Sequence, residues 1–353
     1  MDESIKKVEV LILGQGLAGT LLSYRLHRAD VSHAVVDRGH AHASSNAAAG
    51  IVNPVTGRRF VKAWQIDSLL EGLSIYSELE TLLGVALLNK ITVYRDLSET
   101  SALNQWDMRR RDDAYAPYMG KPTRSLDVPF NIPVVVGPTL KAAQVNLREL
   151  LRAYRLYLIA KQHLVEESLS IDDAKLDAGY WHLGSFAARR IIDCTGAAAI
   201  DTSTWSKLPW RGTKGEALRF TSADFPRDIA IKMKHFACPI GSKDEVWLGA
   251  TNEDHYTHRD ASDVGKARLL EQASAFAIDV PEEAERLVAI RPTVKDRRPL
   301  VGEHAVKKGV WICNGFGTKG TSIAPYCTQQ LIDHFLNKTP LDPEIDVTDR
   351  FVE

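Results

Sequence analysis

The pattern of apolar and polar residues near the start of the chain predicts a strand, a helix and a second strand. Residues 8–13 form a short, almost continuous apolar run, which is typical of a strand buried on both faces. In residues 17–29, apolar side chains recur on one helical face. Residues 33–36 are again apolar and end at Asp37. This order indicates an α/β unit.

Apolar spacing predicts the later elements in the same way. Helices are predicted at residues 64–83, 145–161, 266–277, 281–287 and about 322–336. Strands are predicted at residues 91–94, 134–137, 163–170, 180–184, 188–194 and 310–314, and residues 211–259 are predicted to be mostly β.

The predicted helix at 145–161 carries three arginines on one side. Arg148, Arg152 and Arg155 lie at positions i, i+4 and i+7, which places them in a basic stripe. We expect this stripe to face solvent, because long charged side chains are seldom fully buried.

A glycine-rich turn joins the first strand to the first helix. Gly14, Gly16 and Gly19 fit the pattern G-x-G-x-x-G. In a dinucleotide-binding unit the first glycine allows a tight turn, the second lets the backbone approach a pyrophosphate, and the third lets the helix pack on the strand. Asp37 follows about 20 residues later, where a carboxylate can accept hydrogen bonds from a ribose. The motif predicts dinucleotide binding and leaves FAD and NAD(P) both open.

Three further stretches of small residues are candidates for contact with the same cofactor. Residues 44–50 follow the acid, Thr195 and Gly196 follow an apolar strand, and residues 315–321 join a strand to the last helix, whose N-terminus favours an anion. Taken alone, the first stretch is equally consistent with a surface loop, and the second with an ordinary glycine after a strand.

Charge balance and cysteine content narrow the function classes. The chain has 353 residues, with 44 Lys and Arg against 45 Asp and Glu, so no net positive field favours nucleic acid. Its four cysteines show neither C-x-x-C nor metal-ligand spacing, so we expect reduced thiols and no metal site. No apolar run approaches the roughly 20 residues of a membrane span, and the N-terminus is not a signal peptide. We therefore expect a cytoplasmic protein of open oligomeric state.

The order of these motifs resembles the family of FAD-dependent amino-acid and amine oxidases that includes D-amino-acid oxidase, glycine oxidase and sarcosine oxidase. The matching segments are, in order, GQGLAG, VVD, SSNAAAG, IIDCTGAAA, RGTKGEALRF, LGAT, IRPTVKDRRPLVG and GFGTKGTSIAP. The last turn, GFGTKG, differs from the commoner G-H-x-x-N-G of the family. It is nearer to the G-x-G-S-R-G pattern of the oxidase domain in the bifunctional enzyme that modifies tRNA wobble uridine. The resemblance covers most of the chain and implies FAD. The FAD is expected to be bound non-covalently, because no cysteine stands shortly before residues 298–302, where sarcosine oxidases have the one that tethers it.

The fold class that we expect is α/β with two interleaved domains. One is a doubly wound, Rossmann-like FAD-binding domain, and the other is a substrate domain with a mixed, mostly antiparallel β-sheet. The expected FAD-binding domain comprises residues 1–80, 135–212 and 288–345, and the expected substrate domain comprises residues 81–134 and 213–287.

The resemblance also implies which residues bind the cofactor. They are Gly14, Gly16, Leu17, Ala18, Gly19, Asp37, Arg38, Ser44, Ser45, Ala48, Ala49, Gly50, Ile51, Thr195, Gly196, Gly315, Gly317, Thr318, Lys319, Gly320 and Thr321.

Four residues are implied at the reacting end of the site. Arg291 matches the arginine that binds the substrate carboxylate in the oxidases, and a guanidinium is suited to bind a carboxylate through two hydrogen bonds. The alternative for Arg291 is a structural ion pair. His235 or Phe236 stands where D-amino-acid oxidases have tyrosines over the flavin, and Lys319 is a candidate to stabilise negative charge on the reduced ring.

The resemblance implies a flavin-dependent oxidation of a C–N bond. A hydride passes from a carbon bearing an amine to flavin N5, the imine hydrolyses, and O₂ or another acceptor reoxidises the flavin. We thus expect an FAD-dependent oxidoreductase acting on CH–NH or CH–NH₂ groups of a small amine or amino acid. Two alternatives stay open: a tRNA-modifying flavoprotein oxidase, for which a basic patch is missing, and a flavin-binding protein without amine turnover.

Overall fold

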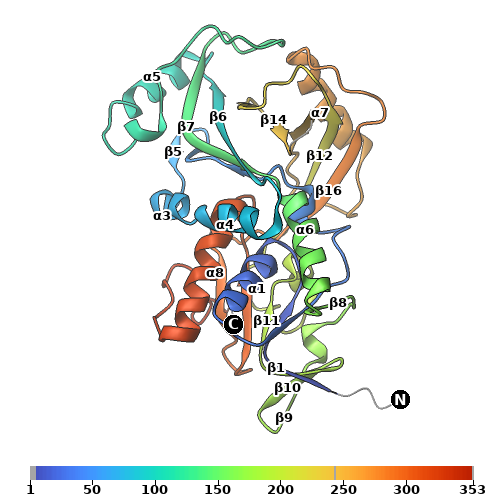
Figure 1. Cartoon of the computed structure of the whole chain (residues 1–353). Coiled ribbons are helices and arrows are strands. Elements are labelled where there is room, and N and C mark those ends of the chain that lie inside the picture. Colours follow the sequence, from blue (N-terminus) through green and yellow to red (C-terminus); the bar gives the residue numbers. More distant parts are fainter. Residues whose placement is uncertain (1–4, 242–243, 352–353) are drawn as a thin grey trace. The chain divides into compact units, whose positions relative to one another are not determined.

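The computed structural model describes residues 5–241 and 244–351, and the chain folds as two compact units (Figure 1). The first unit comprises Met1–Asn46, Arg148–Thr213 and Ile290–Glu353, and the second comprises Ala47–Leu147 and Lys214–Ala289. The chain therefore passes back and forth between the two units.

The first unit is built on a mostly parallel sheet. Its main strands follow the order β17–β18–β11–β1–β2–β8, in which all pairings from β18 to β8 are parallel and β17 is antiparallel. The strands are β1 (Lys6–Leu13), β2 (His33–Val36), β8 (Leu164–Val165), β9 (Lys175–Asp177), β10 (Tyr180–Leu183), β11 (Phe186–Asp193), β17 (Leu300–Glu303) and β18 (Val310–Asn314). Strands are added on one side of β1 and then on the other, which is a doubly wound arrangement.

Helices accompany this sheet. They are α1 (Leu17–Arg28), α2 (Ser44–Ala47), α6 (Leu147–Ala160), α8 (Gly320–Asn337) and the short 3₁₀ helices η2 (Ile171–Asp173) and η3 (Gly196–Asp201). α1 and α8 pack together, and Arg25 of α1 donates to the Pro325 carbonyl at 3.0 Å and to Thr328 Oγ1 at 3.1 Å (Figure 1). Leu11 and Ile191 in the central strands are fully buried, as expected for a parallel sheet.

The second unit is built on a mixed sheet in the order β16–β12–β15–β14–β13–β6–β7–β3. Its elements are β3 (Ile51–Val52), β4 (Val55–Thr56), β5 (Val61–Lys62), α3 (Ile66–Glu71), α4 (Ser74–Leu83), β6 (Leu88–Asp96), α5 (Thr100–Arg109), η1 (Ala116–Tyr118), β7 (Val136–Val145), β12 (Thr213–Thr221), β13 (Ile229–Lys232), β14 (Phe236–Ile240), β15 (Glu245–Gly249), α7 (Asp263–Ala275) and β16 (Glu285–Arg291). β13 pairs with β6 in parallel, whereas the neighbours β12–β15, β15–β14, β14–β13, β6–β7 and β7–β3 are antiparallel. One sheet face packs against α7, where Leu269 and Phe276 are fully buried.

Residues 64–83 form two helices rather than the single predicted one. α3 ends at Glu71 and α4 begins at Ser74, so the helical segment is interrupted at Gly72 and Leu73. Glycine weakens a helix interior. At this point the Leu73 amide donates to the Leu70 carbonyl at 3.2 Å, which forms a tighter turn, and Leu69 and Ile75 on either side stay buried.

The predicted helix at 281–287 is wrong. Pro281 with two following glutamates is typical of a first helical turn. In the structure the amide of Ala284 donates to the Pro281 carbonyl at 3.1 Å, which closes one turn. From Glu285 onward the chain is β16, the strand beside β12. Pairing between distant segments overrides local helix propensity here.

Apart from shifts of one or two residues near 213 and 288, the compact units divide the chain differently from the predicted domains at two places. Residues 47–80 and 135–147 belong to the second unit, whereas we assigned them to the FAD-binding domain. The cause is strand pairing, because β3 pairs with β7 and β7 pairs with β6 in the second sheet.

No helix in the part of the chain that the structure describes has the length and apolar character needed to cross a membrane.

Candidate functional site

Three glycine-containing turns follow neighbouring parallel strands of the first unit. Gly14 and Gly16 follow β1, Gly196 follows β11, and Gly315 and Gly317 follow β18. These three strands are adjacent in the order β18–β11–β1, so the turns lie together at their carboxyl ends. Ligands of open α/β sheets bind at this edge. The structure thus brings together residues that lie about 300 positions apart in the sequence.

The three glycines of the first turn differ in how tightly they are surrounded. A Cβ atom on Gly14, whose φ is +93°, would lie 2.8 Å from the Cys194 carbonyl oxygen, and one on Gly19 would lie 1.9 Å from the Gly14 carbonyl oxygen. A Cβ atom on Gly16 would meet nothing closer than Ser45 Oγ, at 3.7 Å. Gly14 and Gly19 are therefore required by the fold, whereas Gly16 leaves an open approach to the backbone.

The N-terminus of α1 is suited to an anion. Its N-cap is Gly16, which gives no side-chain cap, and its first turn holds no acidic residue. The amide of Leu17 donates to Ser45 Oγ at 3.2 Å, while the amides of Ala18 and Gly19 are in the first turn, where the helix offers them no carbonyl. Such amides and the helix dipole favour a phosphate. These residues fit the pyrophosphate of a dinucleotide.

The second turn is held by a buried carboxylate. Asp193, the last residue of β11, accepts from the Thr195 amide at 2.9 Å and from Thr195 Oγ1 at 2.6 Å, and its other oxygen accepts from Trp205 Nε1 at 2.9 Å. Burial raises the pKa of Asp193. The amide and hydroxyl of Thr195 thus hold the turn, and contacts of Thr195 and Gly196 with the cofactor stay a prediction.

Asn314 links the second and third turns. Its Nδ2 donates to the Gly196 carbonyl at 2.9 Å, and its Oδ1 accepts from the Gly315 amide at 2.8 Å. Our sequence analysis missed both Asn314 and Asp193. A polar residue that ends an otherwise apolar strand was the available signal.

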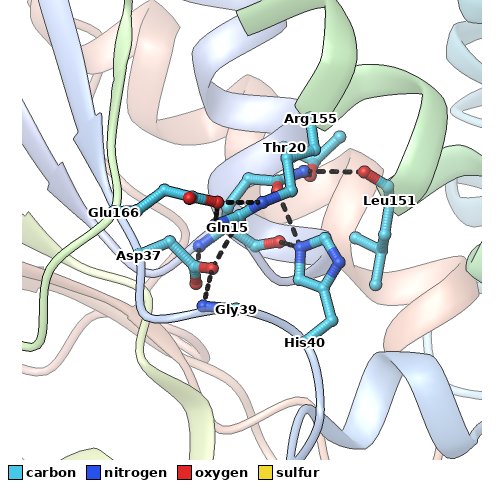
Figure 2. Close-up of polar contacts among 8 residues, drawn as sticks. All are labelled: Gln15, Thr20, Asp37, Gly39, His40, Leu151, Arg155 and Glu166. Atoms are coloured by element: carbon cyan, nitrogen blue, oxygen red, sulfur yellow. Dashed lines mark hydrogen bonds and ion pairs between the residues drawn. The ribbon is translucent and has the colours of Figure 1, made fainter. Parts of the chain in front are cut away.

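The carboxylate of Asp37 is held from three sides (Figure 2). Oδ2 accepts from the Gln15 amide at 2.8 Å, and Oδ1 accepts from the Gly39 amide and from Arg155 Nη1, each at 2.7 Å. A carboxylate has about four acceptor positions. The hydrogen bonds within the described residues therefore leave one acceptor position of Asp37 unused, and its hydrogen bond with a ribose hydroxyl stays a prediction.

Arg155 joins Asp37 to a second carboxylate. Its Nη2 and Nε donate to Glu166 Oε1 at 2.5 and 3.0 Å, and Glu166 follows β8, the neighbour of β2 (Figure 2). The Arg155 side chain is 15% exposed, so the expectation that all three arginines of α6 face solvent is wrong for this one. Arg152, at 58% exposure, does face solvent and pairs with Glu149.

Gln15, the first variable residue of the glycine motif, is part of the same network. Its Nε2 donates to Thr20 Oγ1 at 3.2 Å and to the Leu151 carbonyl at 3.1 Å, and its Oε1 lies 2.7 Å from His40 Nε2 (Figure 2). Burial lowers the pKa of His40 below its ordinary value. His40 thus contacts the first glycine turn directly.

The stretch Ala48–Ile51 belongs to the second unit and is fixed against β7. The Ala49 carbonyl accepts from Gln144 Nε2 at 3.0 Å, and the Gly50 carbonyl accepts from the Val145 amide at 2.9 Å. A Cβ atom on Gly50, whose φ is +72°, would lie 1.9 Å from the Val145 carbonyl oxygen. The glycine is therefore explained by the fold, and the role of these residues toward a cofactor stays a prediction.

Arg291 is connected to the third glycine turn through its neighbours in the chain. The Pro292 carbonyl accepts from the Gly317 amide at 3.2 Å, and a Cβ atom on Gly317 would lie 3.4 Å from Thr293. Burial lowers the pKa of Arg291 to about 10, so its guanidinium is protonated at neutral pH. The turn and the cation are thus parts of one local structure.

The remaining predicted residues of the third turn begin α8. Burial, with Arg297 and Arg298 nearby, lowers the pKa of Lys319, the N-cap of α8. Thr321 is buried in the first turn, whereas Thr318 is exposed, as is Arg38 after β2. The first turn of α8 holds no acidic residue, which again favours an anion.

His235 and Phe236 lie in the second unit, at the start of β14. The ring Nδ1 of His235 is 2.9 Å from the Ala250 carbonyl, and its Nε2 is buried without a hydrogen-bond partner in the described part of the chain. Burial lowers the pKa of His235. The ring is thus neutral at pH 7, and one nitrogen is left for a ligand.

Among residues 5–241 and 244–351, no group of His, Cys, Asp and Glu side chains is arranged to hold a metal ion. The four cysteines are buried free thiols.

Two curated relatives match nearly the whole chain. Glycine oxidase of Geobacillus kaustophilus is 24% identical over 351 residues, which cover 90% of this chain and 90% of that protein. The tRNA 5-methylaminomethyl-2-thiouridine biosynthesis bifunctional protein MnmC of Caulobacter vibrioides is 23% identical over 343 residues, which cover 92% of this chain but 54% of that longer protein.

Solved structures share the fold. The crystal structure of glycine oxidase from Geobacillus kaustophilus superposes with a TM-score of 0.79 at 20% identity and covers 98% of both chains. Iminodiacetate oxidase from Chelativorans sp. BNC1 superposes with a TM-score of 0.76 at 21% identity, covering 96% of this chain and 98% of that one. These matches confirm the predicted α/β fold class.

The model of the DAO family, described as FAD dependent oxidoreductase, matches residues 9–333. The match includes all three glycine turns, Asp37 and Arg291. The chain belongs to the DAO family of FAD-dependent oxidoreductases, and its cofactor is FAD.

Proposed function

We propose that this FAD-dependent oxidoreductase oxidises the C–N bond of a small amine or amino acid that carries a carboxylate. The observation that carries the proposal is the position of Arg291, a protonated and partly buried guanidinium whose neighbour Pro292 is hydrogen-bonded to the third glycine turn. A cation in this place is suited to bind a carboxylate through two parallel hydrogen bonds.

Two of the similar proteins support this substrate class. One is named glycine oxidase and the other iminodiacetate oxidase, and both names specify an amine with a carboxylate on the adjacent carbon. The shared fold places no substrate in this chain, so the support comes from the chemistry of Arg291 together with the family.

The residues of the chain would bind and orient the substrate and stabilise the reduced cofactor. Bound FAD supplies a hydride acceptor. Arg291 would fix the carboxylate and hence the carbon that carries the amine, and such orientation contributes much of the rate of a bimolecular reaction. Lys319 and the first turn of α8 would stabilise negative charge that develops on the cofactor. No strong side-chain base is required when the amine is already neutral.

An anaerobic screen of amines and amino acids for loss of the oxidised flavin spectrum tests the reaction. In the wild type we expect bleaching by at least one carboxylated amine. In Arg291→Ala the apparent affinity for that substrate should fall by about 10- to 100-fold, the range of one charge-assisted hydrogen-bonded pair. Arg189, an exposed arginine of β11, provides the control variant Arg189→Ala, which should leave the affinity unchanged. Equal affinities in both variants would refute the role of Arg291.

A second candidate is oxidation of a modified nucleotide in tRNA. The match to the tRNA-modifying protein favours it, but that match covers 54% of the longer protein. The near-equal numbers of 44 basic and 45 acidic residues argue against a phosphate-binding surface. RNA that co-purifies with the protein and is removed by nuclease treatment would favour this candidate.

A third candidate is a flavin-binding protein without amine turnover. Stoichiometric FAD that no amine reduces would favour it.

A further inference from the structure

A cavity of about 380 Å³ opens in the first unit, away from the glycine turns. Its lining residues come from β1 and β11, from the loop before β2, and from the last turns of α1 and α8. α1 and α8 pack together and begin at the first and third glycine turns (Figure 1). Most of the length of α1, which is about 18 Å for 12 residues, therefore separates the cavity from the first turn. Small-molecule sites commonly have volumes of this size.

Much of the lining of this cavity is apolar. Val10 and Leu26 are each 1% exposed, Val31 and Phe335 are partly buried, and Leu336 is 49% exposed. Contact with an apolar group would remove the exposed part of this surface from water, which is favourable. The lining is therefore suited to a ligand with an apolar portion.

Arg190 adds a cation to the lining. It is opposite Val10 in the pairing of β11 with β1, and its Cζ lies 5.1 Å from the centroid of the Phe335 ring. The Phe335 ring is in turn held edge-on by Trp311, with 4.9 Å between the ring centroids. Among the described residues, Arg190 forms no ion pair with a carboxylate. A guanidinium over an aromatic ring keeps its N–H groups available for a carboxylate.

Asp30 adds the opposite charge. Its amide donates to the His27 carbonyl at 3.1 Å at the end of α1, and its carboxylate has no ion pair in the part of the chain that the structure describes. Asp30 and Arg190 line the same cavity without pairing with each other. The C-terminal ends of α1 and α8 also favour a positive charge here. The basic side chains in the last turn of α1, Arg25, His27 and Arg28, are not part of the lining.

These two charges distinguish between classes of ligand. A simple anion would pair with Arg190 but would meet the carboxylate of Asp30, and a simple cation would meet the reverse arrangement. A zwitterion pairs with both groups, and the apolar lining requires an apolar body as well. An α-amino acid with an apolar side chain combines these three properties.

We propose that this cavity is a binding site for an α-amino acid with an apolar side chain, separate from the cofactor turns. Arg190 binds the carboxylate of the ligand and Asp30 binds its ammonium group. Val10, Leu26 and Phe335 pack against its side chain. The proposal does not rest on the proposed amine oxidation, because the ligand is bound here and not oxidised.

The ligand test uses four probes that the proposed reaction cannot consume. α-Methylleucine is zwitterionic and apolar, and the carbon that bears its amine has no hydrogen. α-Methylleucinamide lacks the carboxylate, isocaproate lacks the ammonium group, and α-aminoisobutyrate lacks most of the apolar side chain. In calorimetric titrations of the wild-type holoprotein, α-methylleucine should bind about tenfold more tightly than each of the other three. Absence of α-methylleucine binding overturns the site, and isocaproate binding of equal strength overturns the assignment to an amino acid.

The residue test pairs each variant with the probe that lacks its partner. In Arg190→Met the Kd of α-methylleucine should rise about tenfold, whereas that of α-methylleucinamide should not change. Arg189, an exposed neighbour on the opposite face of β11, gives the control variant Arg189→Met, which should bind α-methylleucine like the wild type. Equal Kd values for α-methylleucine in these two variants overturn the site.

Asp30→Asn provides an independent arm if Arg190→Met does not fold. Asp30 has a φ of +56°, which asparagine tolerates well, so the variant should keep the turn after α1. The Kd of α-methylleucine should rise about tenfold, and that of isocaproate should not rise, since isocaproate has no ammonium group. Unchanged α-methylleucine binding in Asp30→Asn overturns the role of the carboxylate.

The two proposals fail differently. The holoprotein with Arg291→Ala should keep the wild-type affinity for α-methylleucine. Loss of α-methylleucine binding in Arg291→Ala, with unchanged binding in Arg190→Met, would place the ligand at Arg291 and overturn the cavity site. Binding that depends on Arg190, in a protein whose flavin no amine reduces, would support the cavity site and refute the proposed reaction.

Discussion

Arg155 holds the carboxylates of Asp37 and Glu166 with one guanidinium. Its replacement should weaken the binding of FAD but not that of FMN. Arg155→Met would release Asp37 from one of its three donors and leave Glu166 unpaired. The FAD Kd should rise about tenfold, since a hydrogen bond to a charged group contributes about 1.5–3 kcal/mol. The FMN Kd should not change, because FMN lacks the adenosine ribose that Asp37 is predicted to bind.

Titration of the apoprotein with each flavin, followed by flavin fluorescence, measures both constants. Arg152→Met is the matched control, because Arg152 lies one turn earlier on α6 and pairs only with Glu149 among the contacts described above. Parallel losses for FAD and FMN would mean that Arg155 acts through the fold of the unit and not through Asp37.

The sequence could not assign this function to Arg155. Helical spacing correctly placed Arg148, Arg152 and Arg155 on one side of a helix, but it does not say which other element faces that side. Asp37 is 118 positions away, and only the parallel pairing of β2 with β8 brings Glu166 and Asp37 together. Gly14, Gly19 and Asp37, by contrast, follow from a local motif whose spacing carries the geometry.

At the scale of elements, the glycines of the turn between β1 and α1 have two different functions: one allows close packing, and the other leaves space for the cofactor. Gly19→Ala would place a Cβ atom 1.9 Å from the Gly14 carbonyl and should lower the free energy of unfolding by several kcal/mol. Gly16→Ala meets nothing closer than 3.7 Å, so the fold should keep its stability to within about 1 kcal/mol. FAD affinity should nonetheless fall, since the methyl group would occupy the approach of the pyrophosphate.

Thermal denaturation of the two apoproteins together with FAD titration measures both effects. Gly16→Ala with wild-type FAD affinity would show that the pyrophosphate does not pass over this position. A large loss of stability in Gly16→Ala would show that the open space next to it is needed by the fold.

Helices and strands were predictable where a local pattern determines them. The predictions failed where pairing with a distant strand determines the secondary structure. The strand at 33–36 was predicted with its observed bounds, and the helix at 17–29 ends one residue earlier, at Arg28. Residues 281–287 were predicted to be helical, yet only one turn forms at residues 281–284, and Glu285 begins β16, the neighbour of β12. The sequence within one helix length of residues 281–287 does not show that this segment pairs with a distant strand.

At the scale of the whole chain, the fold class and the cofactor were predictable, because the order of several weak motifs is specific even where each one is not. The division of the chain into two units was harder to predict from the sequence. Residues 47–80 and 135–147 cluster with the second unit because β3, β7 and β6 pair in one sheet, and strand pairing over such separations has no local signature.

The last prediction concerns how the whole chain retains FAD. All four cysteines are buried and free, and none lies just before residues 298–302, so we expect no covalent link. Heat or acid denaturation should release all the flavin into the supernatant, and phosphodiesterase treatment should raise its fluorescence as FAD is cleaved to FMN. Because FAD would bind the folded chain only, saturation at 100 times the Kd should stabilise it by about 2.7 kcal/mol. Flavin that stays with the precipitate, or a Tm independent of added FAD, would contradict non-covalent binding to the native fold.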